Sequence, residues 1–196
     1  MTPRHYSNGT ELVNSSVENI GAKRAVVIFD TRYGNTEKIA RWFESGLQST
    51  GIETMCADTK DVNVESLKGY DLICVGAPTE WHTSSKPMKE FLKKLESVDI
   101  SGKYGFAFDT KLDRMFSGSA ANFIEKRMKH LGLKIIEGGK SATVFLEEGR
   151  VGDAWLKEGE EKRFEQIGRQ VGADLLARAK SIQVRLYHPR ALRLKF

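Results

Sequence analysis

Hydrophobic residues along the middle of this sequence follow two spacings, one typical of strands and the other of helices. Apolar runs with β-branched residues predict five strands, at 24–29, 51–58, 70–79, 103–109 and 133–146, the last broken at Gly138-Gly139. Between these runs, apolar residues recur every three or four positions, as on the buried face of a helix. This spacing predicts helices after the turn at 30–36 and at 64–68, 86–95, 120–131 and 158–180.

Strands that alternate with helices predict an α/β fold with a three-layer, doubly wound, five-stranded parallel sheet. Right-handed connections between parallel strands place helices on both faces of such a sheet. Ligands of these sheets bind beyond the carboxyl ends of the strands. We therefore expect a site built from the loops at 30–36, 78–86 and 109–118.

The length and charge of the chain indicate one folded domain with an extension at each end. Its 196 residues, 40% of them hydrophobic, suffice for one sizeable core, which we place at 24–181, after a flexible polar arm at 1–23. The tail at 182–196 has four cationic side chains and no acidic one, against a net charge of +5 for the chain. Because the basic character lies in this tail, we predict no nucleic-acid partner. We interpret the tail as a solvated extension, and contact with a membrane surface or an acidic partner as the less favoured alternative.

The positions of the cysteines and histidines indicate the cellular compartment of the protein and whether it binds a metal. Cys56 and Cys74 lie in apolar runs and have no partner at ligand spacing, which indicates reduced core residues of a cytoplasmic protein. No apolar stretch approaches the ~20 residues of a membrane span, and no apolar signal segment is present at the N-terminus. The four histidines are scattered, so we predict no metal site.

The turn after the first strand, "TRYGNT", has the chemistry of a phosphate site. Its threonine and tyrosine hydroxyls and the Asn35 amide can bind an anion, and Gly34 permits a tight turn. The helix that follows presents free N–H groups and the positive end of its dipole. The alternative is an ordinary turn in which Thr36 merely caps the helix. No G-x-G-x-x-G follows the strand, so a dinucleotide site is not expected.

The same residues resemble those of a known family. "TRYGNT" is similar to the T-x-T-G-N-T phosphate loop of the flavodoxins, and "ICVGAPTEW" and "SGSAANFIEKRMKHLGLKII" strengthen the likeness. The series of strands and helices from about Arg24 to Lys180 resembles their whole domain. The resemblance implies the strand order 2-1-3-4-5, and FMN as the cofactor.

The resemblance also implies which residues bind FMN. The phosphate would be held by Thr31, Arg32, Tyr33, Gly34, Asn35 and Thr36. One side of the flavin ring would be lined by Pro78, Thr79, Glu80, Trp81 and His82, and the other by Phe108, Asp109, Thr110 and Lys111. An aromatic in an exposed loop suits stacking on a flat apolar ring. The alternative for Trp81 is a surface tryptophan that packs on its own loop.

Two features depart from the family pattern. After the fourth strand only Phe116 is available as a second stacking aromatic, and the segment "EWHTSSKP" lacks the glycine that lets a peptide flip toward the flavin. Cationic or titratable side chains are found in the candidate loops, namely His82, Lys86, Lys111 and Arg114. We therefore hypothesise a weakly stabilised one-electron reduced flavin and easier full reduction. The alternative is that these charges point into solvent and are screened.

Two functions remain open from the sequence. The favoured one is an electron carrier that shuttles electrons between redox partner proteins. The alternative is an enzyme on the same fold, an FMN-dependent NAD(P)H quinone or protoporphyrinogen reductase. The thin aromatic cover and basic loops favour the enzyme, whereas the compact loops favour the carrier.

Overall fold

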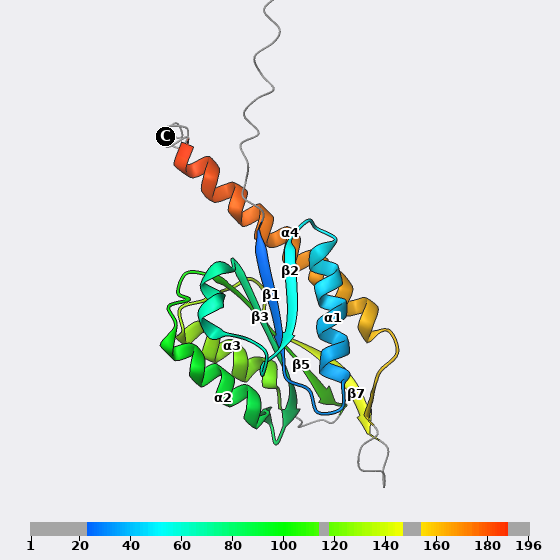
Figure 1. Cartoon of the computed structure of the whole chain (residues 1–196). Coiled ribbons are helices and arrows are strands. Elements are labelled where there is room, and N and C mark those ends of the chain that lie inside the picture. Colours follow the sequence, from blue (N-terminus) through cyan, green and yellow to red (C-terminus); the bar gives the residue numbers. More distant parts are fainter. Residues whose placement is uncertain (1–22, 114–117, 147–153, 188–196) are drawn as a thin grey trace, which may run out of the picture.

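The structure of the chain, a computed structural model, describes residues 23–113, 118–146 and 154–187 (Figure 1). Residues 1–22 of the predicted arm and residues 188–196 of the predicted tail lie outside this part. Within it, helices cover both faces of one central sheet, which gives three layers (Figure 1). The predicted α/β class is therefore confirmed.

Among the described residues, the sheet contains five principal parallel strands and three short ones. The principal strands are β1 (Arg24–Phe29), β2 (Glu53–Asp58), β3 (Leu72–Glu80), β5 (Tyr104–Leu112) and β7 (Lys140–Leu146). Their spatial order, β2-β1-β3-β5-β7, is the predicted order 2-1-3-4-5. The short strands are β4 (Thr83–Ser84), antiparallel to β3, β6 (Lys134–Ile135), parallel to β5, and β8 (Ala154–Leu156), antiparallel to β7.

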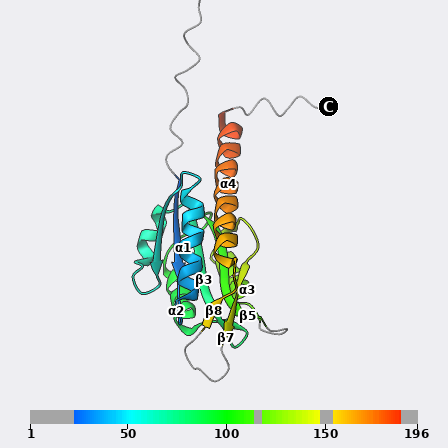
Figure 2. The same ribbon diagram turned by 90° about the vertical axis from the view of Figure 1, so that its right-hand side faces the viewer.

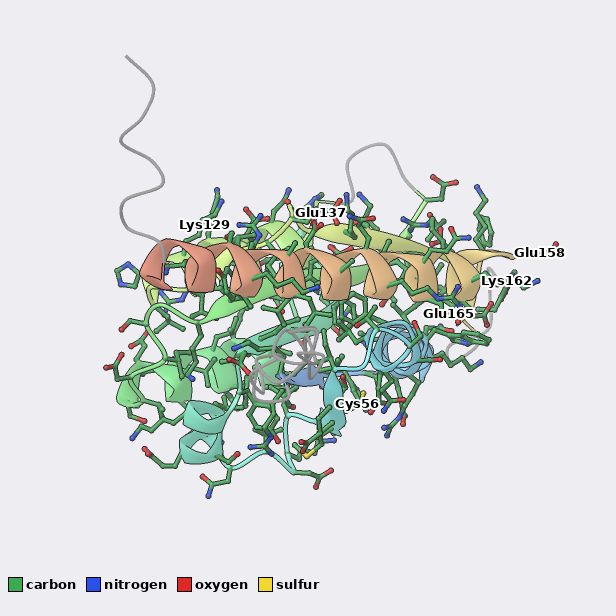
Figure 3. The ribbon with its side chains drawn as sticks, turned by 90° about the horizontal axis from the view of Figure 1, so that it is seen from above. Cys56, Lys129, Glu137, Glu158, Lys162 and Glu165 are labelled. Carbon is green, nitrogen blue, oxygen red and sulfur yellow. The ribbon has the colours of Figure 1, made fainter. Side chains whose placement is uncertain are left out.

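In the part of the chain that the structure describes, four α-helices cover the sheet in pairs. They are α1 (Asn35–Gln48), α2 (Lys86–Lys94), α3 (Ala120–His130) and α4 (Glu160–Tyr187), with short 3₁₀ turns η1 (Val64–Gly69) and η2 (Leu95–Ser97). Helices α1 and α4 share one face and pack on each other. Figure 3, a view from above, shows α4 lying along the sheet with α1 seen end-on beside it. Helices α2 and α3 cover the opposite face (Figure 1).

A separate hydrophobic cluster fills each side of the sheet. On the side of α1 and α4, four phenylalanines pack together, and the rings of Phe43 and Phe106 stack with centroids 4.8 Å apart. On the side of α2 and α3, Met88, Phe91 and Ile124 pack against the strands. Leu72–Val75 of β3 are fully buried, because the central strand is covered on both faces.

Some elements differ from the expected ones. The break in the fifth strand is confirmed, since β6 and β7 flank Gly138-Gly139, whereas β4 and β8 were not predicted. Helix α4 continues to Tyr187 rather than ending near Lys180, so the predicted tail begins inside a helix. This end of α4 extends past the sheet (Figures 1 and 2). No helix in the described ranges is both long and apolar enough to cross a membrane.

Candidate functional site

The turn after β1 enters helix α1 without a capping side chain. Gly34 occupies the N-cap position with a φ of 78°, in the left-handed region that favours glycine. Thr36 lies in the first turn, and its Oγ1 is 2.9 Å from the Oγ1 of Thr110 on β5. The alternative in which Thr36 caps the helix is therefore wrong. Within the described residues, the first N–H groups of α1 have no capping side chain to which they could donate.

Two buried polar atoms beside this turn have no hydrogen-bond partner among the described residues. They are Thr31 Oγ1 and Asn35 Oδ1. The Asn35 amide nitrogen donates to the carbonyl of Ala154 on β8 over 2.9 Å. Because an unpaired buried polar group costs stability, such atoms often mark the position of a ligand. The Thr31 hydroxyl, the uncapped N–H groups and the positive end of the α1 dipole fit an anion such as phosphate.

A cavity of about 200 Å³ lies between this turn and the carboxyl ends of β3, β5 and β7. It brings together ten of the predicted site residues: Thr31, Arg32, Tyr33, Asn35 and Thr36 from the turn, Pro78, Thr79 and Glu80 from β3, and Thr110 and Lys111 from β5. Gly34 shapes the turn through its backbone. The carboxyl edge of a doubly wound sheet is where its ligands bind.

Phe108 and Asp109 do not line this cavity, and neither do Trp81 and His82, although all four were predicted site residues. Phe108 is fully buried in the phenylalanine cluster, and its ring occupies the space that a side chain on Gly76 would need. Asp109 points to the opposite face of the sheet, where it accepts a hydrogen bond from the backbone N–H of Ala121 in α3. β5 continues to Leu112, so Phe108 and Asp109 belong to a strand and alternate between its two faces.

Four apolar residues that sequence reasoning missed complete the cavity wall. Leu112, Val144, Leu146 and Ala154 lie at the end of β5 and on the hairpin of β7 and β8. The prediction considered only the loops after strands one, three and four. The apolar run "TVFL" at the end of the fifth strand was the available signal, because this strand ends at the same sheet edge.

Charged side chains around the cavity have both signs. Nη1 of Arg32 lies 3.8 Å from Oε1 of Glu80, and the guanidinium stacks over the ring of Tyr33 at 5.2 Å from its centroid. Lys111 also lines the cavity. Lys86 instead points into solvent, 88% exposed, beside Glu90.

The hypothesis about basic loops also includes His82 and Arg114. His82 is exposed at the turn after β3. Arg114 lies outside the described residues, as does Phe116, the candidate second aromatic. Among the described residues, the cations that line the cavity are Arg32 and Lys111, and Glu80 opposes them.

The segment after β3 forms a tight two-residue turn. Trp81 and His82 have positive φ values of 47° and 65°, and β4 returns antiparallel to β3. Hairpins of this kind usually place Asn-Gly at these positions, because a positive φ costs a larger residue about 1–3 kcal/mol. The Trp81 side chain is 94% exposed, so it does not pack on its own loop. Its stacking on a flavin ring stays a prediction.

The two cysteines are unpaired, and neither lines the cavity. Burial raises the pKa of Cys74 far above that of an ordinary thiol. Burial, with a smaller contribution from Glu44, raises the pKa of Cys56 to about 12. Cys56 lies on β2, the edge strand far from β7 (Figure 3). Both thiols therefore remain protonated at neutral pH, and they do not act as nucleophiles.

The strand order and the cavity at the carboxyl edge place this chain among the doubly wound α/β proteins of flavodoxin-like topology. The family model described as Flavodoxin matches residues 27–167, and the chain belongs to the flavodoxin family. Proteins of this family are flavoproteins that bind FMN and transport electrons.

Individual relatives are distant in sequence. A flavodoxin of Clostridium saccharobutylicum is 26% identical over 117 residues, which are 58% of this chain and 72% of that protein. A nitric oxide reductase of Moorella thermoacetica is 27% identical over 163 residues, 80% of this chain and 37% of that protein. The solved structure of a flavodoxin from the domain Archaea superposes with a TM-score of 0.65 at 21% identity, covering 78% of this chain and 99% of that one. The chain thus spans about a third of the length of some relatives.

Proposed function

We propose that this chain is an FMN-dependent electron carrier that exchanges electrons with redox partner proteins. The observation that carries the proposal is the cavity, in which an anion-binding turn and an apolar wall meet at the carboxyl edge of the sheet. Bound FMN would supply a group that accepts and releases electrons. No inserted domain covers the mouth among the described residues, so a partner protein could approach the ring edge directly.

The chain's own residues would bind the two ends of FMN differently. Thr31, Gly34, Asn35 and Thr36 would hold the phosphate, because this turn offers a buried hydroxyl and uncapped N–H groups. Arg32 would add a positive charge, which it shares with Glu80. Two further sets would line the ring: Pro78, Thr79, Glu80 and Trp81 on one side, and Thr110, Lys111 and Leu112 on the other. Phe108 and Asp109 are not assigned to contact with the cofactor.

A reductase that acts on an organic substrate is the second candidate. Its support is the aliphatic wall of Leu112, Val144 and Leu146, which offers apolar surface for a quinone-like molecule beside the ring. The carrier is favoured because the cavity of about 200 Å³ offers little room besides the cofactor. The two functions differ in their electron donor: a carrier receives electrons from a protein, and the reductase from NAD(P)H.

An FMN titration with two threonine variants tests the proposed cofactor site. We expect tight binding by the wild type and a Kd raised about tenfold to a hundredfold in Thr31→Val, which loses a hydrogen bond to a charged phosphate. Thr54→Val is the control. It changes a threonine on β2 whose hydroxyl donates a hydrogen bond to the Ile52 carbonyl, and it should bind FMN as tightly as the wild type does. Equal affinities of all three proteins would contradict the assigned phosphate turn.

The electron donor is tested on the FMN-loaded protein under anaerobic conditions. If NAD(P)H alone leaves the flavin absorbance unchanged while a flavodoxin reductase bleaches it, the chain is a carrier. Rapid bleaching by NAD(P)H alone, followed by reoxidation with a quinone, would replace the carrier by the reductase.

A further inference from the structure

The turn formed by Trp81 and His82 needs an external support. Both residues have a positive φ, and neither is glycine or asparagine. The exposed Trp81 side chain makes almost no contact that could hold the turn. Strained backbone of this kind persists only where surrounding contacts determine it, and it is common at functional sites.

Asp109 is the centre of the hydrogen bonds beneath this turn. Its carboxylate is fully buried, and Oδ2 accepts three hydrogen bonds. The donors are the hydroxyl of Thr79 at 3.0 Å, the hydroxyl of Ser119 at 2.8 Å and the N–H of Ala121 at 2.9 Å. Because Thr79 lies near the end of β3 and the other two at the start of α3, one carboxylate joins the two segments.

Two more contacts extend this support to the turn itself. The Thr79 hydroxyl also accepts a hydrogen bond from the N–H of Ala120 over 2.9 Å. His82 forms a parallel bridge with Gly118, and a Cβ on Gly118 would lie only 2.5 Å from the Cα of His82. The start of α3 therefore fits directly against the turn, and Asp109 bonds both α3 and the strand that leads into the turn.

We propose that Asp109 is a positioning residue that holds the strained Trp81–His82 turn against the start of α3, and with it the position of Trp81, which directly follows the cavity-lining residue Glu80. The position of the turn follows from the contacts of the chain alone. Its consequence for the flavin ring rests on the proposed function. Asp109 itself acts only through Thr79 and α3, since it does not line the cavity.

Amide hydrogen exchange of the FMN-free protein tests the support without the cofactor. Asp109→Asn keeps the shape of the side chain and removes its negative charge. We expect exchange at Ala120 and Ala121 to accelerate at least about tenfold, because local opening of the α3 start becomes easier. Val27, in the buried centre of β1, should keep its rate. Equal acceleration at Val27, or no change at Ala120 and Ala121, would overturn the proposal.

Asp99→Asn serves as the matched control for removal of a carboxylate. Asp99 also accepts hydrogen bonds from a serine hydroxyl and a backbone N–H, both of Ser101, but it is exposed and lies outside the site. Its variant should leave exchange at Ala120 and Ala121 unchanged. Acceleration there in Asp99→Asn would show that any lost carboxylate loosens α3, and it would overturn the specific role of Asp109.

FMN affinity in a double-mutant cycle tests whether Asp109 acts through Trp81. We expect Asp109→Asn to raise the Kd about tenfold in the wild-type background and less than about twofold in Trp81→Ala, because the aromatic side chain to be positioned is then missing. If the double variant raised the Kd by the product of the factors found for the two single variants, the link to Trp81 would be overturned. If the wild type binds no FMN, the proposed function fails, whereas the exchange experiment still decides the role of Asp109.

Discussion

At the scale of single residues, one hydroxyl pair joins the turn after β1 to the middle of the sheet. Thr36 lies in the first turn of α1 and Thr110 in β5, and both are almost completely buried. Their Oγ1 atoms are 2.9 Å apart, so one hydroxyl donates a hydrogen bond to the other. The pair therefore fixes the position of the first turn of α1, to which the uncapped N–H groups belong.

Removing one hydroxyl of this pair should lower the free energy of unfolding more than removing both hydroxyls. Thr36→Val leaves the Thr110 hydroxyl buried and unpaired, which we expect to lower the free energy of unfolding by about 1–3 kcal/mol. Thr110→Val should have a similar effect. The double variant should recover most of the loss, because no unpaired hydroxyl then remains. Urea unfolding of the FMN-free proteins measures all three, and strictly additive losses would contradict the pairing.

Charge at the cavity should influence the reduction potential of bound FMN. Fully reduced flavin gains negative charge, so a nearby cation stabilises it. Lys111→Gln should therefore lower the two-electron potential, by on the order of 10–30 mV for one partly screened charge. Lys86→Gln is the control, because Lys86 is exposed beside Glu90. Anaerobic titration against a dye of known potential measures both, and equal shifts would refute a specific effect of Lys111.

The sequence allowed most of the cavity residues to be predicted, but not which residues near the ends of β3 and β5 point into it. The chemistry of "TRYGNT" is sufficient to predict an anion site, since hydroxyls, an amide and a glycine precede a helix. The position of Phe108 depends on Gly76 of the neighbouring strand, whose missing side chain leaves room for the ring. The role of Asp109 depends on α3. Such contacts join segments that are distant in sequence, and local spacing does not contain them.

At the scale of elements, the principal strands and the helices follow from hydrophobic spacing, and the short strands do not. β4 was missed because Trp81–His82 carries no turn residue, although both adopt the backbone of a tight turn. β8 has three residues, too few for a periodic pattern. The carboxyl end of α4 was missed because the basic residues after Lys180 were interpreted as a tail.

Helices α1 and α4 meet through glycines, and this contact should tolerate no side chain. A Cβ on Gly168 of α4 would lie 2.3 Å from the carbonyl oxygen of Phe43 in α1. Alanine has a helix propensity about 1 kcal/mol better than glycine, but rigid backbone cannot move aside, and overpacking costs about 1–3 kcal/mol or more. We therefore expect Gly168→Ala to be destabilising in urea unfolding. Gly138→Ala, at an open position, should be nearly neutral.

At the scale of the whole molecule, the carboxyl edge of the sheet, where the parallel strands end, and the amino edge, where they begin, have different roles. The carboxyl edge gathers the turn after β1, the ends of β3 and β5 and the β7–β8 hairpin around one cavity. The amino edge is held by polar contacts, among them Asp71, which accepts hydrogen bonds from the Lys23 ammonium at 2.9 Å and the Arg24 N–H at 3.0 Å. We therefore expect that changes at the amino edge alter stability without altering cofactor binding.

Acid should weaken the amino edge through Asp71. Burial alone would raise its pKa, but the hydrogen bonds from Arg24 and Lys23 outweigh burial and lower the pKa below that of an ordinary aspartate. A group with a lowered folded pKa stabilises the protein above its unfolded pKa of about 4, and this stability is lost as the pH falls through the folded value. Asp71→Asn should therefore be less stable than the wild type at pH 7, with a difference that shrinks toward pH 3.

The exposed Asp61, changed to Asn, is the control for this acid effect, and it should follow the wild type in urea unfolding at each pH. Because Asp71 lies at the edge away from the cavity, the folded Asp71→Asn protein should bind FMN at pH 7 as tightly as the wild type. A constant stability difference between pH 7 and pH 3 would contradict the lowered pKa. A weakened FMN affinity would instead show that the two edges are coupled through the strands between them.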